Sequence, residues 1–112
     1  MAKDADRKNS RQSVRASSRV TAKLVEYRER EIEPPPNGEL EMLIDVGDSL
    51  KHIRAFRKLT TRAVEHDSGV KGGPLKISLI ERALFPGLTL VEARKIADAL
   101  GYQMEVTFKE KK

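Results

Sequence analysis

Residues 59–70, Leu-Thr-Thr-Arg-Ala-Val-Glu-His-Asp-Ser-Gly-Val, decide how this chain is expected to fold. Thr60 is a good N-terminal cap and Gly69 a good C-terminal stop, so the stretch predicts a short helix. Gly72-Gly73-Pro74 then breaks the chain, and Pro74 suits the first turn of a following helix that runs to about Leu84. The apolar residues expected to face the core from that helix are Leu75, Ile77, Ile80 and Leu84. Two short helices joined by a glycine-rich turn are therefore expected.

The segment before these two helices predicts another one. Apolar residues crowd the stretch 40–46, and Gly47-Asp48 follows, with Asp48 or Ser49 placed to cap a helix that starts there. Three apolar residues are expected to share the buried face of this helix: Leu50, Ile53 and Phe56. The stretch 40–46 is thus expected to lead into the helix.

The segment after the two helices predicts a further helix and then a strand. Thr89 and Glu92 have the spacing of a capping box, apolar residues repeat at helical spacing up to Leu100, and Gly101 marks the end. The following residues alternate strictly, which predicts a half-buried β-strand with Tyr102, Met104, Val106 and Phe108 on its apolar face. A lone strand needs a second edge, which either residues 40–46 or the same strand of a second subunit would supply.

The N-terminal part of the chain has a different composition. Residues 1–23 hold seven basic and two acidic side chains, and residues 1–19 are expected to form a disordered basic tail because they contain few apolar groups. Apolar residues at helical spacing after Val20 favour a short helix, which Pro34-Pro35-Pro36 ends. The predicted organisation is a tail over 1–19, a short helix with a proline-rich linker over 20–38, and a folded domain over 39–112.

The overall composition narrows the class of protein. A chain of 112 residues with 38% hydrophobic and 4% aromatic residues is expected to form one small helical domain. It has no cysteine and no apolar run long enough for a membrane span, so we expect a soluble, cytoplasmic protein without membrane contact. The net charge of +5 favours a polyanionic partner.

Neither an enzyme nor a cofactor-binding protein is expected. His66-Asp67-Ser68 contains the residue types of a hydrolase triad, but these residues are adjacent in sequence, whereas a triad converges in space from separate positions. Two histidines and no cysteine supply a metal site poorly. The glycines from Gly69 onward do not have the pattern of a phosphate-binding loop. We therefore predict no catalytic residues, no metal ligands and no cofactor.

Residues 45–102 resemble the Cro/Xre helix-turn-helix family, which includes phage repressors, plasmid regulators and antitoxins. The resemblance is carried by Gly47-Asp48-Ser49-Leu50, Leu59-Thr60-Thr61, Ser68-Gly69-Val70, Ile77-Ser78-Leu79-Ile80-Glu81-Arg82 and Ile96-Ala97-Asp98-Ala99-Leu100-Gly101. It implies a mainly α, lambda-repressor-like bundle of four to five short helices, in which one helix of the pair enters the major groove of double-stranded DNA. It also implies a transcriptional regulator, a repressor or antitoxin, that acts as a homodimer on an operator.

By this resemblance, seven residues would contact DNA. Thr60 and Thr61 would lie at the phosphate-contacting start of the first helix of the pair. Three residues would lie on or just before the reading face of the second helix: Lys71, Lys76 and Ser78. Two more would be flanking phosphate contacts: Arg62 and Arg82. The predicted strand over 102–108 would pair two subunits, as it does in some members of the family, and a two-fold dimer suits a palindromic operator.

Two residues depart from the family's pattern and keep other functions open. Glu65 stands where the family usually has a small Ala, and Asp67 where it usually has a buried Leu. Acidic side chains near a DNA-binding face repel phosphate, so one alternative is a protein-interaction module that binds a toxin or another regulator without reading DNA. A second alternative is nonspecific nucleic-acid binding through the basic tail alone. The turn over 71–74 is also longer than the family's usual turn.

Overall fold

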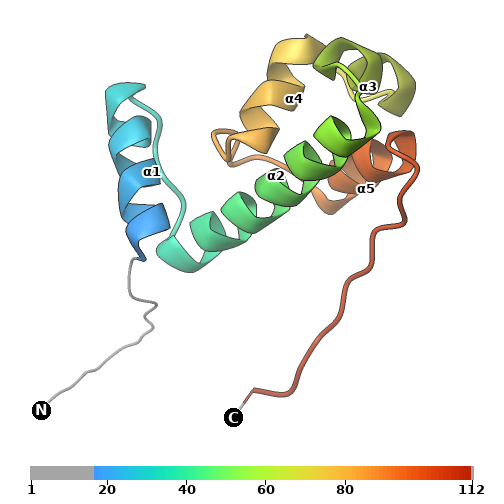
Figure 1. Ribbon diagram of the computed structural model, residues 1–112. Coiled ribbons are helices and arrows are strands. Elements are labelled where there is room, and N and C mark those ends of the chain that lie inside the picture. Colours follow the sequence, from blue (N-terminus) through green and yellow to red (C-terminus); the bar gives the residue numbers. More distant parts are fainter. Residues whose placement is uncertain (1–16, 112) are drawn as a thin grey trace, which may run out of the picture.

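Five α-helices make up the part of the chain that the structure describes (Figure 1). The computed structural model describes residues 17–111, and within this range it has no β-strand, so the predicted mainly α class is confirmed. Of the predicted basic tail, residues 1–16 lie outside the described residues, Ser17 caps the first helix, and residues 18–19 begin it. No helix in the described range has the length and apolar character needed to cross a membrane. The helices are α1 (Ser18–Glu29), α2 (Asn37–Arg57), α3 (Thr61–Ser68), α4 (Gly73–Glu81) and α5 (Leu90–Ala99).

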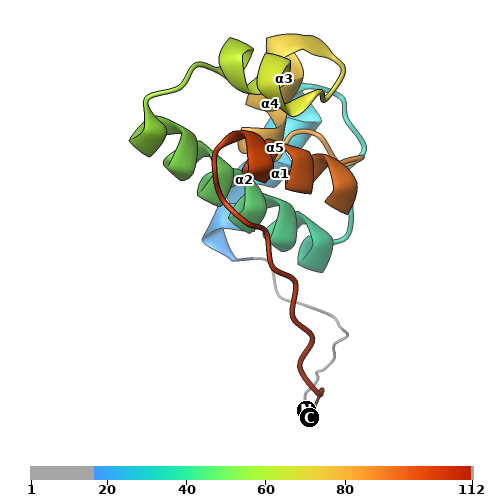
Figure 2. The same cartoon turned by 90° about the vertical axis from the view of Figure 1, so that its right-hand side faces the viewer.

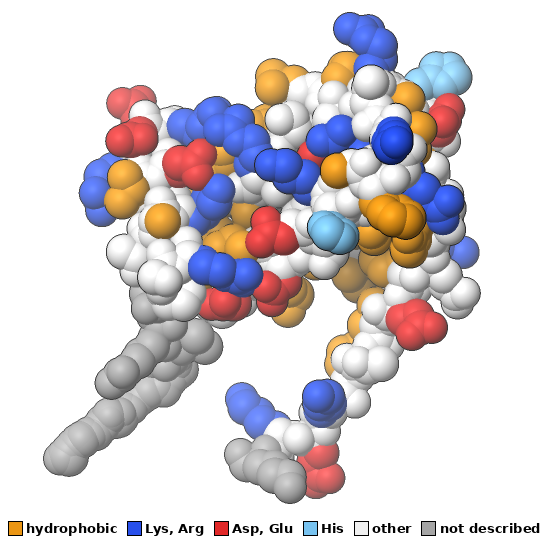
Figure 3. All heavy atoms as spheres, in the orientation of Figure 1, with side chains coloured by type: hydrophobic (Ala, Val, Ile, Leu, Met, Phe, Trp, Pro, Cys, Tyr) orange, Lys and Arg blue, Asp and Glu red, His pale blue; other side chains and the backbone are white. Residues whose placement is uncertain are grey.

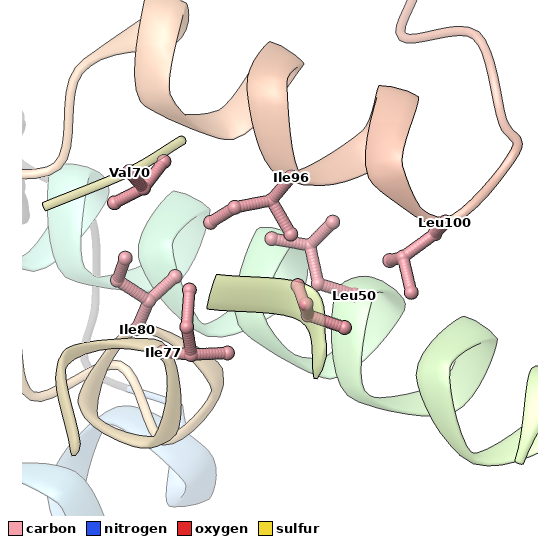
Figure 4. Close-up of a cluster of buried hydrophobic side chains, with 7 residues drawn as sticks. Leu50, Val70, Ile77, Ile80, Ile96 and Leu100 are labelled. Carbon is pink, nitrogen blue, oxygen red and sulfur yellow. The ribbon is translucent and has the colours of Figure 1, made fainter. Parts of the chain in front are cut away.

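Two clusters of buried apolar side chains hold these helices together. The first lies between α2, α3, α4 and α5, and Figure 4 shows its side chains converging from these elements. Its members are Leu50, Val64, Val70, Ile77, Ile80, Ile96 and Leu100. The second joins α1 to the N-terminal half of α2 and to the chain that follows α4. Its members are Val20, Tyr27, Leu40, Ile44, Ala83 and Leu84. Because α2 contributes to both clusters, it is the central element of the fold.

The helix predicted after Val20 is present as α1, and it packs onto the rest of the chain. Ser17 caps it by accepting a hydrogen bond from the backbone N–H of Val20. Tyr27 is fully buried, and its hydroxyl donates to the backbone oxygen of Ala83 at 2.7 Å. Burial raises the pKa of the Tyr27 hydroxyl, which keeps this group protonated as a donor. The contact joins α1 to the end of α4.

The predicted start of a helix at Gly47 is wrong. Residues 40–46 are helical, and α2 runs without a break from Asn37 to Arg57. Gly47 lies in the middle of this helix and against the end of α4, where a Cβ atom would come within 2.6 Å of the backbone oxygen of Ile80. The glycine is therefore a point of close backbone packing, and the cost of a glycine inside a helix is accepted because it lets the two helices approach.

Phe56 was predicted to lie on the buried face of α2, and this prediction is wrong. Its side chain is 71% exposed, whereas Leu50 is buried and Ile53 packs against the first cluster. Six residues advance an α-helix by about 600°, so Phe56 points about 120° away from Leu50. Each step of three residues moves the side chain about 60° around the helix, so the second step from Leu50 leaves the buried face.

The predicted C-terminal strand is also wrong. Residues 102–111 are described but belong to no helix or strand, and Figures 1 and 2 show this segment leaving the bundle as an extended chain. Its proposed intrachain partner, residues 40–46, is helical and has no strand edge to offer. A strand exists only as part of a sheet, so alternation alone leaves the segment unpaired. Val106 is 51% and Phe108 95% exposed in consequence.

The helix caps predicted for α3, α4 and α5 are confirmed. Thr60 accepts a hydrogen bond from the backbone N–H of Ala63, and Gly69 ends α3 with a left-handed φ of 75°. Pro74 lies in the first turn of α4. Thr89 and Glu92 form both halves of the capping box at the start of α5. These caps satisfy backbone groups that the helix ends would otherwise leave unpaired.

Candidate nucleic-acid interface

The two short helices α3 and α4 are joined by a four-residue turn and packed against each other. Val64 of α3, Val70 of the turn and Ile77 of α4 are all buried in the first cluster. Close apolar packing of this kind has little freedom to shift, so it fixes the angle between the two helices. A rigid pair of helices is a suitable scaffold for a binding surface.

The seven residues predicted to contact DNA differ in their exposure. Four are exposed: Thr60, Arg62, Lys71 and Arg82. Three are half-buried: Thr61, Lys76 and Ser78. In Figure 3, Lys and Arg side chains follow one another across the upper part of the face shown, and Asp and Glu side chains lie below them and at the left and right edges. The exposed residues at the start of α3 and in the turn can reach a polyanion without rearrangement of the helices.

Lys76 is engaged with α5. Its Nζ lies 2.6 Å from Oε2 of Glu92 and 4.8 Å from the centroid of the Phe85 ring. The hydrogen bond from Lys76 is the main cause that lowers the pKa of the Glu92 carboxyl, and the Thr89 backbone N–H adds to the effect. The same carboxylate thus completes the α5 cap and holds a basic residue of α4. In this arrangement Lys76 fixes α4 relative to α5.

Arg82 is engaged with α1. Its Nη2 lies 3.3 Å from Oε2 of Glu26, and the other oxygen of this carboxylate receives Lys23 at 2.7 Å. The hydrogen bond from Lys23 is the first cause that lowers the pKa of Glu26, with Arg82 contributing. Arg82 remains 42% exposed. It therefore joins the C-terminal end of α4 to α1 while keeping part of its guanidinium in solvent.

An ion pair between α2 and α4 was not predicted from the sequence. Arg54 donates from Nε and Nη2 to the two carboxylate oxygens of Glu81 at 2.6 and 3.0 Å, and from Nη1 to the backbone oxygen of Leu59 at 2.8 Å. Glu81 is only 6% exposed. A bidentate pair with this little solvent fixes orientation as well as distance. The two residues are 27 positions apart and belong to no motif, so no local pattern indicates the pairing.

Leu75 was predicted to face the core, and this prediction is wrong. Its side chain is 67% exposed, while Ile77 and Ile80 of the same helix are fully buried. Two residues rotate an α-helix by about 200°, so the helix that buries Ile77 turns Leu75 outward. Ser78 follows Leu75 by three residues and lies on the same side of α4. The outer face of α4 therefore begins with an apolar side chain.

The His66-Asp67-Ser68 sequence does not converge on a pocket in the structure. His66 Nδ1 lies 3.2 Å from Oδ1 of Asp67 with both side chains exposed. Ser68 Oγ donates to the backbone oxygen of Glu65 and accepts from the Val70 N–H. The serine is therefore committed to the end of α3. Within residues 17–111, no group of three or more His, Asp or Glu side chains could hold a metal ion.

A shallow groove of about 310 Å³ runs between α2, α5 and the first residues of the C-terminal segment. The Arg57 guanidinium lies 4.9 Å from the centroid of the Tyr102 ring and anchors the segment where it leaves α5. Two of the four residues predicted for the dimer strand, Tyr102 and Met104, line this groove, and Val106 and Phe108 extend beyond it. The other apolar groups of the groove come from Val46, Leu50, Ile53, Ala93 and Ala97.

Comparison with protein-family models, with curated proteins and with solved structures found no significant match, so the function is argued from the site itself.

Proposed function

We propose that this chain is a sequence-specific, DNA-binding transcriptional regulator, a repressor or antitoxin of the lambda-repressor-like helix-turn-helix type. The observation that carries the proposal is the rigid α3–turn–α4 unit, with polar and basic side chains exposed at the start of α3 and in the turn. Such a pair can place one helix in the major groove while the other contacts the sugar-phosphate backbone. The net charge of +5 favours the same partner.

The contacting residues have different roles in this proposal. Thr60, Thr61 and Arg62 face phosphates at the start of α3, and Lys71 reaches the backbone from the turn. Ser78 lies on the reading face of α4. Lys76 and Arg82 act mainly by positioning α4, because Glu92 and Glu26 already hold them. The basic residues before α1 add affinity that falls steeply with salt.

The regulator acts as a dimer in this proposal. Its C-terminal segment is extended, and its apolar residues Val106 and Phe108 are exposed beyond the groove between α2 and α5. Contact with the same segment of a second copy would remove these apolar side chains from water. Two reading helices would then be related by a two-fold axis, as a palindromic operator requires.

A protein-interaction module is the second candidate. It is favoured by the exposed Leu75 on the outer face of α4 and by Asp67, whose side chain is 57% exposed near the end of α3. In this alternative the helix pair keeps its scaffold, and its outer face binds a toxin or another regulator.

The proposal is tested by fluorescence anisotropy with the duplex upstream of the chain's own gene and with a scrambled duplex, at low and near-physiological salt. A preference for its own duplex that survives the higher salt is expected. Arg62→Ala and Lys71→Ala should weaken binding to all sequences and each reduce the salt slope by about one. Lys95→Ala removes the same charge from the exposed face of α5 and should leave binding nearly unchanged.

Other outcomes would redirect the assignment. Equal binding to both duplexes that disappears at higher salt would leave only the basic tail as a DNA contact. Absence of binding would favour the protein-interaction module. The double variant Glu65→Ala/Asp67→Leu separates the two candidates: a DNA reader should retain or gain affinity for DNA, whereas an interaction module should lose affinity for its partner.

A further inference from the structure

The outer face of α4 has little hydrogen-bonding capacity. Leu75 is the one residue of α4 that is exposed, and Ser78, one turn later, is half-buried. The long basic side chain of this helix, Lys76, is held by Glu92 at 2.6 Å. A helix that discriminates bases by bidentate hydrogen bonds needs Arg, Lys, Asn or Gln on its outer face. Here that position is occupied by a leucine.

The chemistry of the major groove restricts what an exposed leucine can recognise. Each base pair presents hydrogen-bond donors and acceptors there, and the 5-methyl group of thymine is the apolar exception. Contact between Leu75 and this methyl group would remove two apolar surfaces from water. Contact with the edge of guanine or cytosine would instead desolvate polar groups without replacing their hydrogen bonds. A leucine at this position therefore favours thymine over the other bases.

The exposed basic residues that precede Leu75 in the chain suit a nucleic acid better than an apolar protein surface. Lys71 lies four residues before it and is exposed in the turn, and Arg62 is exposed in the first turn of α3. Basic side chains on the approach to α4 can hold phosphates while the first turn of the helix enters the groove. Leu75 is thus an apolar residue at the start of a helix that basic residues precede.

We propose that Leu75 determines specificity by contacting the 5-methyl group of one thymine in each half-site. The inference rests on the DNA-binding function proposed above. It adds the chemical group that is read and the side chain that reads it.

The experiment begins with selection of tightly bound duplexes from a random-sequence pool by the full-length chain. In the best-bound duplex each thymine is then replaced in turn by deoxyuridine, which removes only the methyl group. At one thymine per half-site the replacement should weaken binding by about fivefold, the equivalent of one buried methyl group. The Leu75→Ala variant should bind the unmodified duplex about fivefold more weakly than the unsubstituted chain does. Its affinity should not change when deoxyuridine replaces that thymine.

Two further variants serve as controls. Leu75→Met keeps an apolar side chain of similar size and should retain the sensitivity to deoxyuridine. Met42→Ala truncates an apolar residue of α2 that is 64% exposed. This variant should bind the selected duplex and its deoxyuridine form with the same affinities as the unsubstituted chain. Circular dichroism of each variant verifies that the helices are intact.

The outcomes separate the two proposals. An enriched sequence in which no thymine methyl affects binding, or in which the effect persists in Leu75→Ala, would overturn the role of Leu75 and leave the DNA-binding function standing. If no sequence is enriched, sequence-specific binding itself is refuted, and the reading of thymine with it.

Discussion

Gly47 is a residue at which two helices, α2 and α4, pack closely. A Cβ atom there would lie 2.6 Å from the Ile80 oxygen and 2.7 Å from the Glu81 oxygen, and both are backbone atoms that cannot swing away. Gly47→Ala should therefore lower the free energy of unfolding by about 1–3 kcal/mol, the cost of an overpacked core. The loss is expected although Ala is the better helix former by up to about 1 kcal/mol. Denaturant unfolding followed by circular dichroism measures it.

Gly87→Ala is the matched control for this prediction. A Cβ atom at Gly87 would meet the Phe85 ring at 3.8 Å, an ordinary contact distance. Stability should change by less than about 0.5 kcal/mol, as is usual for surface substitutions. An unchanged or higher stability of Gly47→Ala would mean that α2 and α4 can separate at this crossing without cost.

The pair Arg54–Glu81 gives a second prediction at the level of single residues. Arg54→Met would leave the nearly buried Glu81 carboxylate without its partner and the Leu59 oxygen without its hydrogen bond from Arg54. The expected loss is about 3–5 kcal/mol, as for other buried charges stripped of their partner. The double variant Arg54→Met/Glu81→Leu should recover much of that stability. Additive losses in the double variant, measured by the same unfolding experiment, would contradict an energetic coupling of the two side chains.

Single residues also mark the limit of what the sequence allows one to predict about the site. The caps Thr60 and Thr89 act within three residues of themselves, so their roles could be predicted from spacing. The partners of Lys76 and Arg82 lie 16 and 56 residues away, so their engagement could not. Leu75 was misplaced because α4 carries apolar residues on more than one side, so these residues do not define a single buried face.

At the scale of elements, Lys76 and Glu92 connect α4 to α5, and the connection depends on pH. Because the pKa of Glu92 is depressed below its ordinary value of 4.5, its ionised form is favoured in the folded state. The stabilisation is therefore complete above about pH 4.5 and is lost as the pH falls through the folded-state pKa. Glu92→Gln keeps a side chain that can form the capping box and removes the charge. It should be less stable than the unsubstituted chain by about 1 kcal/mol or less at neutral pH.

Thermal unfolding of both proteins between pH 7 and pH 3 tests this dependence. The difference in stability should be constant at neutral pH and shrink below about pH 4.5. Glu26 also has a depressed pKa, but it is present in both proteins and cancels in the comparison. A difference that stays constant down to pH 3 would show that the Glu92 charge contributes nothing to the contact between α4 and α5.

Elements themselves were predictable where their signals are local. The α1, α3, α4 and α5 helices follow from apolar spacing and caps. The start of α2 was predicted too late, at Gly47, because a glycine in a helix interior is unfavourable by itself. The contact with α4 that compensates for this cost lies more than thirty residues away in the sequence. The C-terminal strand was expected from alternation, but a strand requires a partner edge that the sequence of one segment cannot supply.

At the scale of the whole molecule, the exposed C-terminal segment should determine the oligomeric state. If two copies pair through this segment, Phe108→Asp places a charge in the interface and should shift sedimentation-equilibrium profiles from dimer towards monomer. Affinity for a duplex with two half-sites should fall with it, because the second half-site no longer benefits from a linked binding domain. Val25→Asp, at an exposed position of α1, is the control and should change neither. A chain that is monomeric without any substitution would remove the dimer from the proposed mechanism.

The contact between Tyr27 and Ala83 also has a consequence for the order in which the protein is made. The two residues are 56 positions apart, and two members of the second cluster, Ala83 and Leu84, follow α4. At the usual pace of synthesis, about 3–11 seconds pass between the appearance of Tyr27 and that of Ala83. During this interval α1 can pack against Leu40 and Ile44 of α2, but the backbone oxygen that accepts the Tyr27 hydrogen bond is not yet present. The first helix of the nascent chain therefore completes its packing only after α4 has been synthesised.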